Sequence, residues 1–212
     1  MFVDIDEKEL TESLLSISET EVCGLARSII VSGFPMRATI DREYMNEVRI
    51  MKLDKQIAFQ ARKTLLEDPD VKRACKLGSA KGGSGHDTFL RGIRVFMNVT
   101  ATQVWWLQMG RYTFVDIVSS QSKMHRIRQM LGVTTDEGDD IDLIYNCPLA
   151  LKLTAGLSTN YLQLKTIYGQ RRGHRLKEWQ TFCDWIEQLP LFKELTGVRE
   201  KESWTYDDSQ RR

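Results

Sequence analysis

The spacing of apolar residues near the start of the chain predicts helices. Apolar residues recur at helical spacing over residues 5–16 and 19–30. Ser18 or Thr20 is a suitable N-cap for the second of these segments, and residues 33–35, Gly-Phe-Pro, form a stop signal. We therefore predict two short helices followed by a break in the chain.

A second helical region is predicted over residues 41–67, with an interruption near residues 52–54, and Asp68-Pro69 ends it. Its apolar stripe consists of Met45, Val48, Ile50, Met51, Leu53, Ile57, Ala61 and Leu65. Stripes at this spacing usually pack into a core or against another subunit. We therefore expect packing, and not ligand binding, from this region.

Alternating polarity predicts a strand further along the chain. Residues 93–99 alternate in the manner of a half-buried strand. The expected inner face consists of Ile93, Val95, Met97 and Val99. Thr102 is then positioned to cap a short helix. The residues of this helix that we expect to pack inward are Trp105, Trp106 and Met109.

The last predicted helix covers residues 176–189 and ends at Pro190. One of its faces carries Leu176, Trp179, Phe182, Cys183 and Ile186. This pattern is typical of core or interface packing. A charged tail, residues 198–212, follows.

The chain has no internal repeat and no Pro/Ser-rich linker, which indicates one domain over residues 1–212. We expect this domain to consist of a helical N-terminal part (1–70), a strand-helix-loop segment with candidate site residues (85–126), C-terminal helices (148–190) and the tail (198–212).

Charge and cysteine usage exclude several function classes. The 212-residue chain has a formal net charge of +1, which gives no overall attraction to nucleic acids or membrane surfaces. No apolar run approaches the roughly 18 residues of a membrane span, and the first residues are acidic. The four cysteines form no Cys-x-x-Cys pair and have no histidine at ligand spacing. We therefore expect a cytoplasmic protein with reduced, mostly buried thiols, no metal site, and no DNA, RNA or membrane partner.

A glycine-rich segment, residues 76–88, precedes the predicted strand. Its glycines and lysines are compatible with a phosphate loop, but no Gly-Lys-Ser/Thr follows, so the Walker pattern is absent. A flexible loop is the simpler interpretation. His86 keeps a ligand role open, because a histidine that ends a glycine loop beside Asp87 and Thr88 can approach a ligand closely.

The stretch from residue 108 to residue 126 is rich in hydrogen-bond donors and follows an apolar run. It is either an anion pocket or a polar surface loop after a core helix, and these residues alone leave both interpretations open. Gln108 and Arg111 are three residues apart, so on a helix their side chains share one face and can hold one ligand.

Gly85-His86-Asp87-Thr88 precedes the predicted strand, and Gln108-x-x-Arg111 follows it. This order resembles the characteristic segment of the flavin-dependent thymidylate synthase family. That segment has Gly-His-x-Thr, a strand, and then Gln-x-x-Arg-His-Arg. The chain aligns with it without a gap through Thr113.

Further along, four residues follow a second pattern of the same family: Pro148, Asn160, Arg171 and His174. There the family has a proline-leucine start to a long helix, an asparagine, an arginine, and a His-Ala-Gln-x-Glu-like start to the last helix. The spacings agree, with one residue fewer before His174. The two matches together cover about half of the chain, in the right order.

The resemblance implies an α+β fold, with a twisted mixed sheet and long helices. In that family FAD and deoxyuridine monophosphate (dUMP) bind between the subunits of a homotetramer, so a homo-oligomer is implied, with a tetramer favoured. FAD is the implied cofactor, and the implied flavin-facing residues are His86, Thr88, Asn160 and His174. The implied nucleotide-facing residues are Gln108, Arg111, Ser122 and Arg171, and Lys123 and Arg126 are further candidates for nucleotide binding. Arg171 is the implied catalytic residue, because a guanidinium in a dry pocket favours negative charge that develops on a pyrimidine.

Several positions depart from the family pattern. Its Arg-His-Arg reads Arg111-Tyr112-Thr113 here. At two positions where the family has phosphate-binding arginines, this chain has Met124 and Ile144. Lys123 or Arg126 is a candidate substitute, although a lysine cannot reproduce the bidentate grip of an arginine.

Two functions follow from these matches and departures. One is a divergent flavin-dependent pyrimidine-nucleotide synthase that acts on dUMP, which the retained residues His86, Asn160, Arg171 and His174 favour. The other is a non-catalytic protein that binds a nucleotide signal and so acts against host defence. The chain also resembles phage and prophage proteins that share the run at residues 119–125, and this likeness implies the host cytoplasm as its location.

Overall fold

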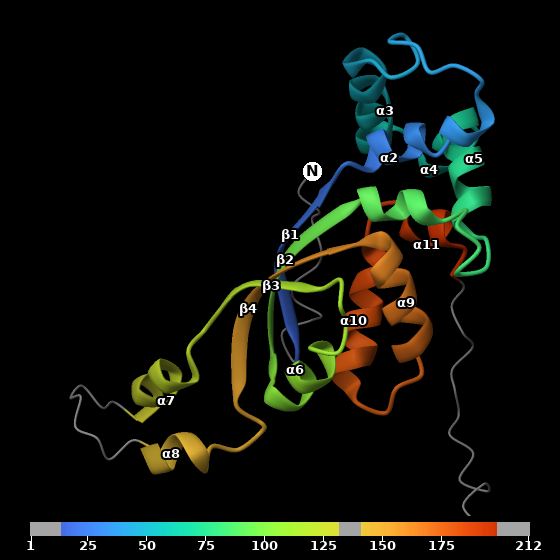
Figure 1. The fold of residues 1–212 in the computed structure, drawn as a ribbon. Helices are drawn as coiled ribbons and strands as arrows, with labels where there is room; N and C mark the ends of the chain where they lie inside the picture. The colour runs from blue at the N-terminus through green and yellow to red at the C-terminus, as the bar shows by residue number, and fades with distance from the viewer. Residues whose placement is uncertain (1–13, 132–140, 199–212) are drawn as a thin grey trace, which may run out of the picture.

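The computed structural model describes residues 14–131 and 141–198. Its strands form one four-stranded sheet in the order β1-β2-β4-β3 (Figure 1). They are β1 (Ser16–Cys23), β2 (Arg94–Thr102), β3 (Asp116–Ser120) and β4 (Lys152–Asn160). Together with the helices, this sheet confirms the α+β class. Most of the helix predicted over residues 5–16 and nearly all of the charged tail lie outside the described residues.

The expected mixture of parallel and antiparallel strands is wrong for the described residues, because every strand pair is antiparallel. Cys23 at the end of β1 pairs with Arg94 at the start of β2. Thr102 at the end of β2 likewise pairs with Lys152 at the start of β4. β1 and β4 therefore both run opposite to β2. β3, which follows β2 in the chain, pairs antiparallel with β4 and so runs in the same direction as β2.

The helix predicted over residues 19–30 is only half right. Residues up to Cys23 belong to β1, and α2 (Leu25–Val31) begins after them. Ile17 and Val22 are buried, and their spacing is compatible with a strand as well as with a helix. Hydrogen bonding to β2 stabilises the strand. Gly24 separates the two elements with φ 75°, and a Cβ there would lie 2.6 Å from the Gly92 carbonyl oxygen.

The helical region predicted over residues 41–67 is interrupted at residues 60–61, and the interruption predicted near residues 52–54 is wrong, because these residues lie inside a continuous helix. The region contains α3 (Glu47–Phe59) and α4 (Arg62–Leu65), preceded by the short η1 (Phe34–Met36). Of the apolar stripe, Leu53 and Leu65 are buried, whereas Val48 is 75% and Met51 is 57% exposed. Core packing is therefore correct for part of the stripe only. Asp68 does not simply end this region: its side chain caps α5 (Pro69–Gly78).

The strand and the last helix agree with their predictions. Val95, Met97 and Val99 of β2 are buried on one face of the sheet. Thr102 caps α6 (Gln103–Met109), because its hydroxyl accepts from the Trp105 backbone N–H. α10 (Lys177–Gln188) buries the predicted aromatic face, and its Trp179 ring lies 5.0 Å from that of Trp105. The helices α6, α9 (Tyr161–Arg171), α10 and α11 (Phe192–Thr196) lie beside the sheet in Figure 1.

The long helix expected from Pro148 is wrong. Lys152–Asn160 is the inner strand β4, and α9 begins only at Tyr161. β4 pairs with β2 on one side and β3 on the other, and these pairings outweigh local helical spacing.

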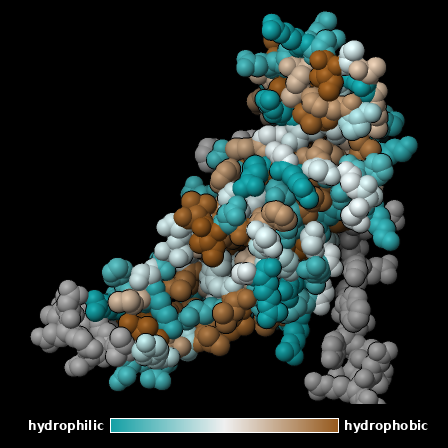
Figure 2. All heavy atoms as spheres, in the orientation of Figure 1, coloured by the Kyte–Doolittle hydropathy of each residue, from teal (hydrophilic) through white to brown (hydrophobic). Residues whose placement is uncertain are grey.

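An arm of the chain extends from the sheet between β3 and β4 and carries α7 (Lys123–Leu131) and α8 (Ile141–Tyr145) (Figure 1). All five residues of β3 are exposed, including Ile117 and Val118. Figure 2 shows a hydrophobic patch over this strand. The described chain therefore leaves an apolar sheet edge open to solvent.

The four cysteines are free thiols. Cys183 is fully buried, and burial raises the pKa of its thiol to about 12. The other three are partly buried, so the expectation of mostly buried thiols holds best for Cys183. In the described residues, every helix is too short or too polar to cross a membrane.

Candidate functional site

The strongest candidate site surrounds Arg171, at the end of α9. The Arg171 Nε donates to the Tyr112 hydroxyl at 2.7 Å, and its Nη1 donates to the Gln108 Oε1 at 3.1 Å. Its guanidinium carbon lies 4.5 Å from the centroid of the Trp179 ring. The same Gln108 oxygen accepts from the Trp179 indole N–H at 2.9 Å. We call Gln108, Tyr112, Arg171 and Trp179 the Arg171 cluster.

Local structure explains why these side chains meet. Gln108 lies in the last turn of α6, and Tyr112 lies in the turn that follows it. Arg171 is the last residue of α9, and Trp179 lies in the first turn of α10. Because Trp179 is fully buried between these helices, its ring forms a rigid base under the guanidinium.

The electrostatics of the Arg171 cluster favour an anion. Among the described residues, the hydrogen-bond partners of Arg171 are the neutral oxygens of Gln108 and Tyr112, and none is a carboxylate. The side chain is partly buried, so its charge is screened less than that of a surface arginine. A guanidinium held in this way has a fixed orientation and an uncompensated charge.

His174 lies in the turn between α9 and α10, beside the Arg171 cluster. Its Nδ1 accepts from the Leu176 backbone N–H at 3.1 Å, and its ring lies 6.4 Å from that of Trp179. Partial burial and the charges of Arg171 and Arg175 lower the pKa of His174 below 6.5. The imidazole is therefore neutral near pH 7, with Nε2 as its remaining polar atom.

Arg111 does not share a helix face with Gln108. α6 ends at Met109, and Arg111 follows in an exposed turn. Gly110 ends the helix there, so the spacing of three residues no longer places the two side chains together. In the folded chain the partner of Gln108 is Arg171, which is distant in sequence.

A cavity of about 770 Å³ lies beside the glycine loop, and we call it the His86 cavity. It is bordered by α2, η1, the end of α5 and η2 (Thr88–Gly92). Its lining consists of Arg27, Ser28, Val31, Ser32, Phe34, Pro35, Met36, Leu77, Gly85, His86, Thr88, Phe89 and Gly92. The His86 side chain is exposed and makes no hydrogen bond to any described residue, so it is available to a ligand.

The glycine loop is anchored at Asp87, which is only 3% exposed. The Lys165 ammonium on α9 donates to the Asp87 carboxylate at 2.8 Å. It also donates to the carbonyl oxygens of Gly78 and Ala80, at 2.8 and 2.9 Å. The simple interpretation of a flexible loop is therefore wrong for the Asp87 end, which is fixed against α9 on one side of the His86 cavity.

Thr88 and Asn160 have structural roles within the chain. The Thr88 hydroxyl donates to the Gly85 carbonyl at 2.7 Å and shapes the wall of the His86 cavity. The Asn160 Oδ1 accepts from the Gln163 backbone N–H at 3.0 Å and caps α9. α9 has 11 residues, so at about 1.5 Å per residue Asn160 and Arg171 lie roughly 16 Å apart.

Ser122, Lys123 and Arg126 lie on the arm, at and near the start of α7 (Figure 1). The Ser122 hydroxyl accepts from the His125 backbone N–H at 3.5 Å, and Arg126 donates to Gln129 at 3.3 Å. These three residues do not reach Arg171 in the same chain. The donor-rich stretch therefore divides into a buried start that joins the Arg171 cluster and an exposed remainder on β3 and α7.

The structure adds three site residues that sequence reasoning missed. Trp179, expected only to pack inward, lies under the Arg171 guanidinium. Tyr112 stands where the family pattern has a histidine, and it holds Arg171. Lys165 anchors the glycine loop from 78 residues away in sequence. The sequence could have indicated Tyr112, because it directly follows Arg111 of the family pattern. No sequence pattern indicated Lys165.

The described residues contain no group of His, Cys, Asp and Glu side chains arranged to hold a metal ion.

The antiparallel sheet with helices beside it places the chain in the α+β class. A solved structure with a similar arrangement is the flavin-dependent thymidylate synthase ThyX from Helicobacter pylori, complexed with FAD and dUMP. Its TM-score is 0.54 at 13% sequence identity, over 83% of this chain and 94% of that one. A second structure of Helicobacter pylori thymidylate synthase X with FAD and dUMP has a TM-score of 0.49 at 14% identity, over 68% and 91% of the chains. The sequence matches no protein-family profile and no curated protein. At this identity the first structure shows a shared fold.

Proposed function

We propose that the protein binds a pyrimidine nucleotide of the dUMP type at the Arg171 cluster. The observation that carries this proposal is the Arg171 guanidinium, which is fixed by two neutral oxygens and has no carboxylate partner among the described residues. An anionic ligand would supply the missing charge. The shared fold with an enzyme solved with FAD and dUMP supports this ligand class.

FAD is the cofactor that we propose for the His86 cavity. The cavity of about 770 Å³ lies within the range of about 300–1,000 Å³ usual for ligand pockets. Apolar and aromatic side chains line most of it, and His86 offers an uncommitted imidazole beside the Gly85 backbone. These features fit a ring system with polar substituents. The flavin would supply the reducing chemistry that methylation of a pyrimidine carbon requires.

We propose that the complete site forms between subunits of a homo-oligomer, with a tetramer favoured. His174 lies beside Arg171, but Asn160 lies at the opposite end of α9, so one chain does not bring all of the implied flavin residues to the nucleotide residues. Ser122, Lys123 and Arg126 project on the arm, where they can serve a neighbouring subunit. The exposed apolar β3 supports such a contact.

In a catalytic version of this function Arg171 is the catalytic residue. Negative charge that develops on the pyrimidine during reaction at C5 would lie near its guanidinium, and a fixed cation in a partly dry site stabilises such charge. The neutral His174 imidazole beside it can donate a hydrogen bond through Nε2, because its Nδ1 is the acceptor. Gln108 and Tyr112 act as positioning residues.

A non-catalytic nucleotide-binding protein is the second candidate. The observation that favours it is the arm, where Met124 is exposed on α7 at a position that holds an arginine in the family pattern. Loss of this arginine would weaken the binding of a single phosphate group, which fits a ligand other than dUMP. We propose for this case a phage protein that sequesters a nucleotide signal of host defence in the host cytoplasm, through the same intersubunit site.

Gln108→Glu tests the proposed nucleotide site without a change in side-chain size. The new carboxylate would pair with Arg171 and neutralise it, so we expect dUMP affinity in calorimetric titration to fall by about tenfold or more. Gln188→Glu, an identical change at the exposed end of α10, is the control and should bind as the wild type does. Equal dUMP affinity for wild type and Gln108→Glu would overturn the proposal.

Flavin content separates the two candidates. Purified protein that is yellow, with flavin absorbance bleached by a reduced nicotinamide cofactor, supports the enzyme. Colourless protein that takes up no added FAD contradicts it. Nucleotides released by heat and identified by mass spectrometry would then name the ligand of the non-catalytic protein.

A further inference from the structure

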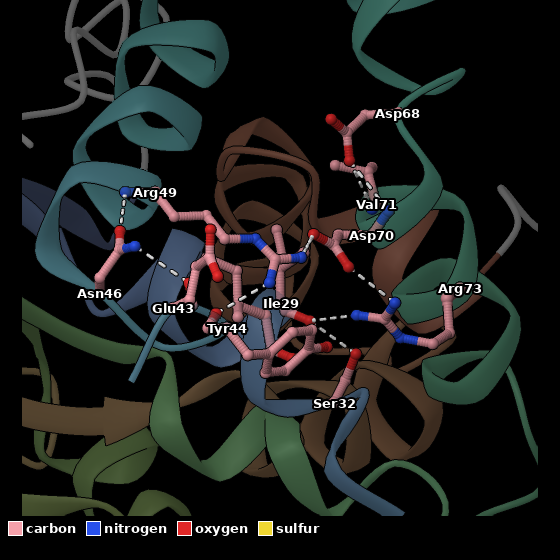
Figure 3. Close-up of polar contacts among 11 residues, drawn as sticks. Ile29, Ser32, Glu43, Tyr44, Asn46, Arg49, Asp68, Asp70, Val71 and Arg73 are labelled. Carbon is pink, nitrogen blue, oxygen red and sulfur yellow. Dashed lines mark hydrogen bonds and ion pairs between the residues drawn. The ribbon is translucent and has the colours of Figure 1, made fainter. Parts of the chain in front are cut away.

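A group of three arginines, Arg37, Arg49 and Arg73, lies where α2, η1, α3 and α5 meet. Figure 3 shows polar contacts of Arg49 and Arg73. Arg49 of α3 and Arg73 of α5 converge on the carboxylate of Asp70, and the Arg73 contact is 2.7 Å long. Arg73 Nη2 also donates to the Ile29 carbonyl at 3.2 Å. These contacts connect three helices around one carboxylate.

Positive charge in this group exceeds negative charge. The guanidinium carbons of Arg37 and Arg49 lie 3.5 and 4.3 Å from the centroid of the Tyr44 ring. Asp70 neutralises part of the charge on Arg49 and Arg73, whereas Arg37 makes no ion pair with any described residue. Arg49 and Arg73 therefore share one carboxylate, and Arg37 lies outside these ion pairs.

A cavity of about 390 Å³ opens beside this group. Arg37 and Arg73 are the charged residues in its lining, and this lining, all of it described, includes no carboxylate. The Arg73 Nε is buried and has no hydrogen-bond partner among the described residues. Gly33 leaves room for the guanidinium, since a Cβ there would lie 2.8 Å from its central carbon.

We propose that this cavity binds the phosphate group of a small ligand. Planar guanidiniums match phosphate oxygens with paired hydrogen bonds, and two arginines without a carboxylate in the lining favour a dianion. The volume of about 390 Å³ lies near the lower end of the usual range of about 300–1,000 Å³, so the ligand is inorganic phosphate or a small phosphate monoester.

Calorimetric titration of the full chain with inorganic phosphate and with ribose 5-phosphate, at constant ionic strength, tests this site. The Arg37 side chain is exposed and lies over the Tyr44 ring without an ion pair to any described residue, so Arg37→Gln should fold normally. We expect wild type to bind at least one probe and Arg37→Gln to bind it about tenfold or more weakly. Tighter binding of ribose 5-phosphate would identify an esterified phosphate, and equal binding a free one.

Two controls separate this site from its surroundings and from the Arg171 cluster. Arg42→Gln removes a nearby exposed arginine that does not line the cavity, and it should bind phosphate as the wild type does. Arg171→Gln should also retain phosphate binding here while it loses dUMP. Failure of both probes to bind wild type, or loss of binding in Arg171→Gln but not in Arg37→Gln, would overturn the proposal.

Discussion

Arg171 and Arg172 are neighbours at the end of α9, yet their surroundings differ in kind. Arg171 is held by the neutral oxygens of Gln108 and Tyr112 and lies over the Trp179 ring. Arg172 is bound to the carboxylates of Asp184 and Glu187 on α10. Two adjacent cations thus face two sides of α10, one with its charge free and the other with its charge neutralised.

The difference separates a binding role from a structural one. On the Arg172 side, Glu187 also accepts from Tyr168 at 2.6 Å and from Lys193 at 2.8 Å, so one carboxylate connects three elements. Such a network stabilises the fold because every charge has a partner. On the Arg171 side the charge has no partner of its own, which suits a ligand. The comparison can be tested by removing charge from each side in turn.

The largest effect is expected from Glu187→Gln, which removes the central charge of the network. Glu187 is only 11% exposed, and loss of its charged hydrogen bonds should lower the free energy of unfolding by about 1.5–3 kcal/mol in urea denaturation. Asp184→Asn is the matched control: Asp184 is 54% exposed, so its loss should cost at most about 1 kcal/mol. Equal effects of the two substitutions would show that Glu187 does not organise this side.

A smaller effect is the loss, as the pH is lowered, of the stability that the Glu187 carboxylate contributes. Partial burial opposes ionisation of Glu187, but hydrogen bonds from Lys193 and Tyr168 and the charge of Arg172 lower its pKa below 4.5 in the folded protein. A depressed folded-state pKa contributes stability above the unfolded value and loses it as the pH falls through the folded value.

The stability difference between wild type and Glu187→Gln should therefore be largest near neutral pH and shrink below about pH 4.5. Urea denaturation of both proteins at a series of pH values measures it, and the subtraction removes the contribution of the other carboxyls. A difference that stays constant down to pH 3 would contradict the assigned pKa direction.

Elements with strong local periodicity could be predicted from the sequence. The alternation over residues 93–99 and the apolar face of residues 176–189 correspond to β2 and α10, because both bury one continuous face against the core. β4 could not be predicted in the same way. Its residues are mostly small and polar, and it is a strand because β2 and β3 pair with it on both sides.

Parts of the candidate site can be predicted from the sequence, namely the residues that match the family pattern individually. The family pattern indicates Gln108 and Arg171, and the structure brings them together. Helical spacing groups Arg111 with Gln108, but α6 ends before Arg111. The contact between Lys165 and Asp87 depends on how α9 packs against the glycine loop, and no local pattern encodes such a tertiary contact.

The smallest expected effect compares the two arginines directly, through the pKa of His174. Burial and the charges of Arg171 and Arg175 lower this pKa below 6.5. Arg171→Gln removes one of these charges, so the pKa of His174 should rise toward 6.5 in an NMR titration of the imidazole signals. Arg172→Gln should leave it unchanged, because Asp184 and Glu187 already neutralise that cation. Since the chain has three histidines, the signals are few enough to assign. An equal rise in both variants would mean that the charge of Arg172 is as exposed to its surroundings as that of Arg171, and the distinction between a binding side and a structural side of α10 would fail.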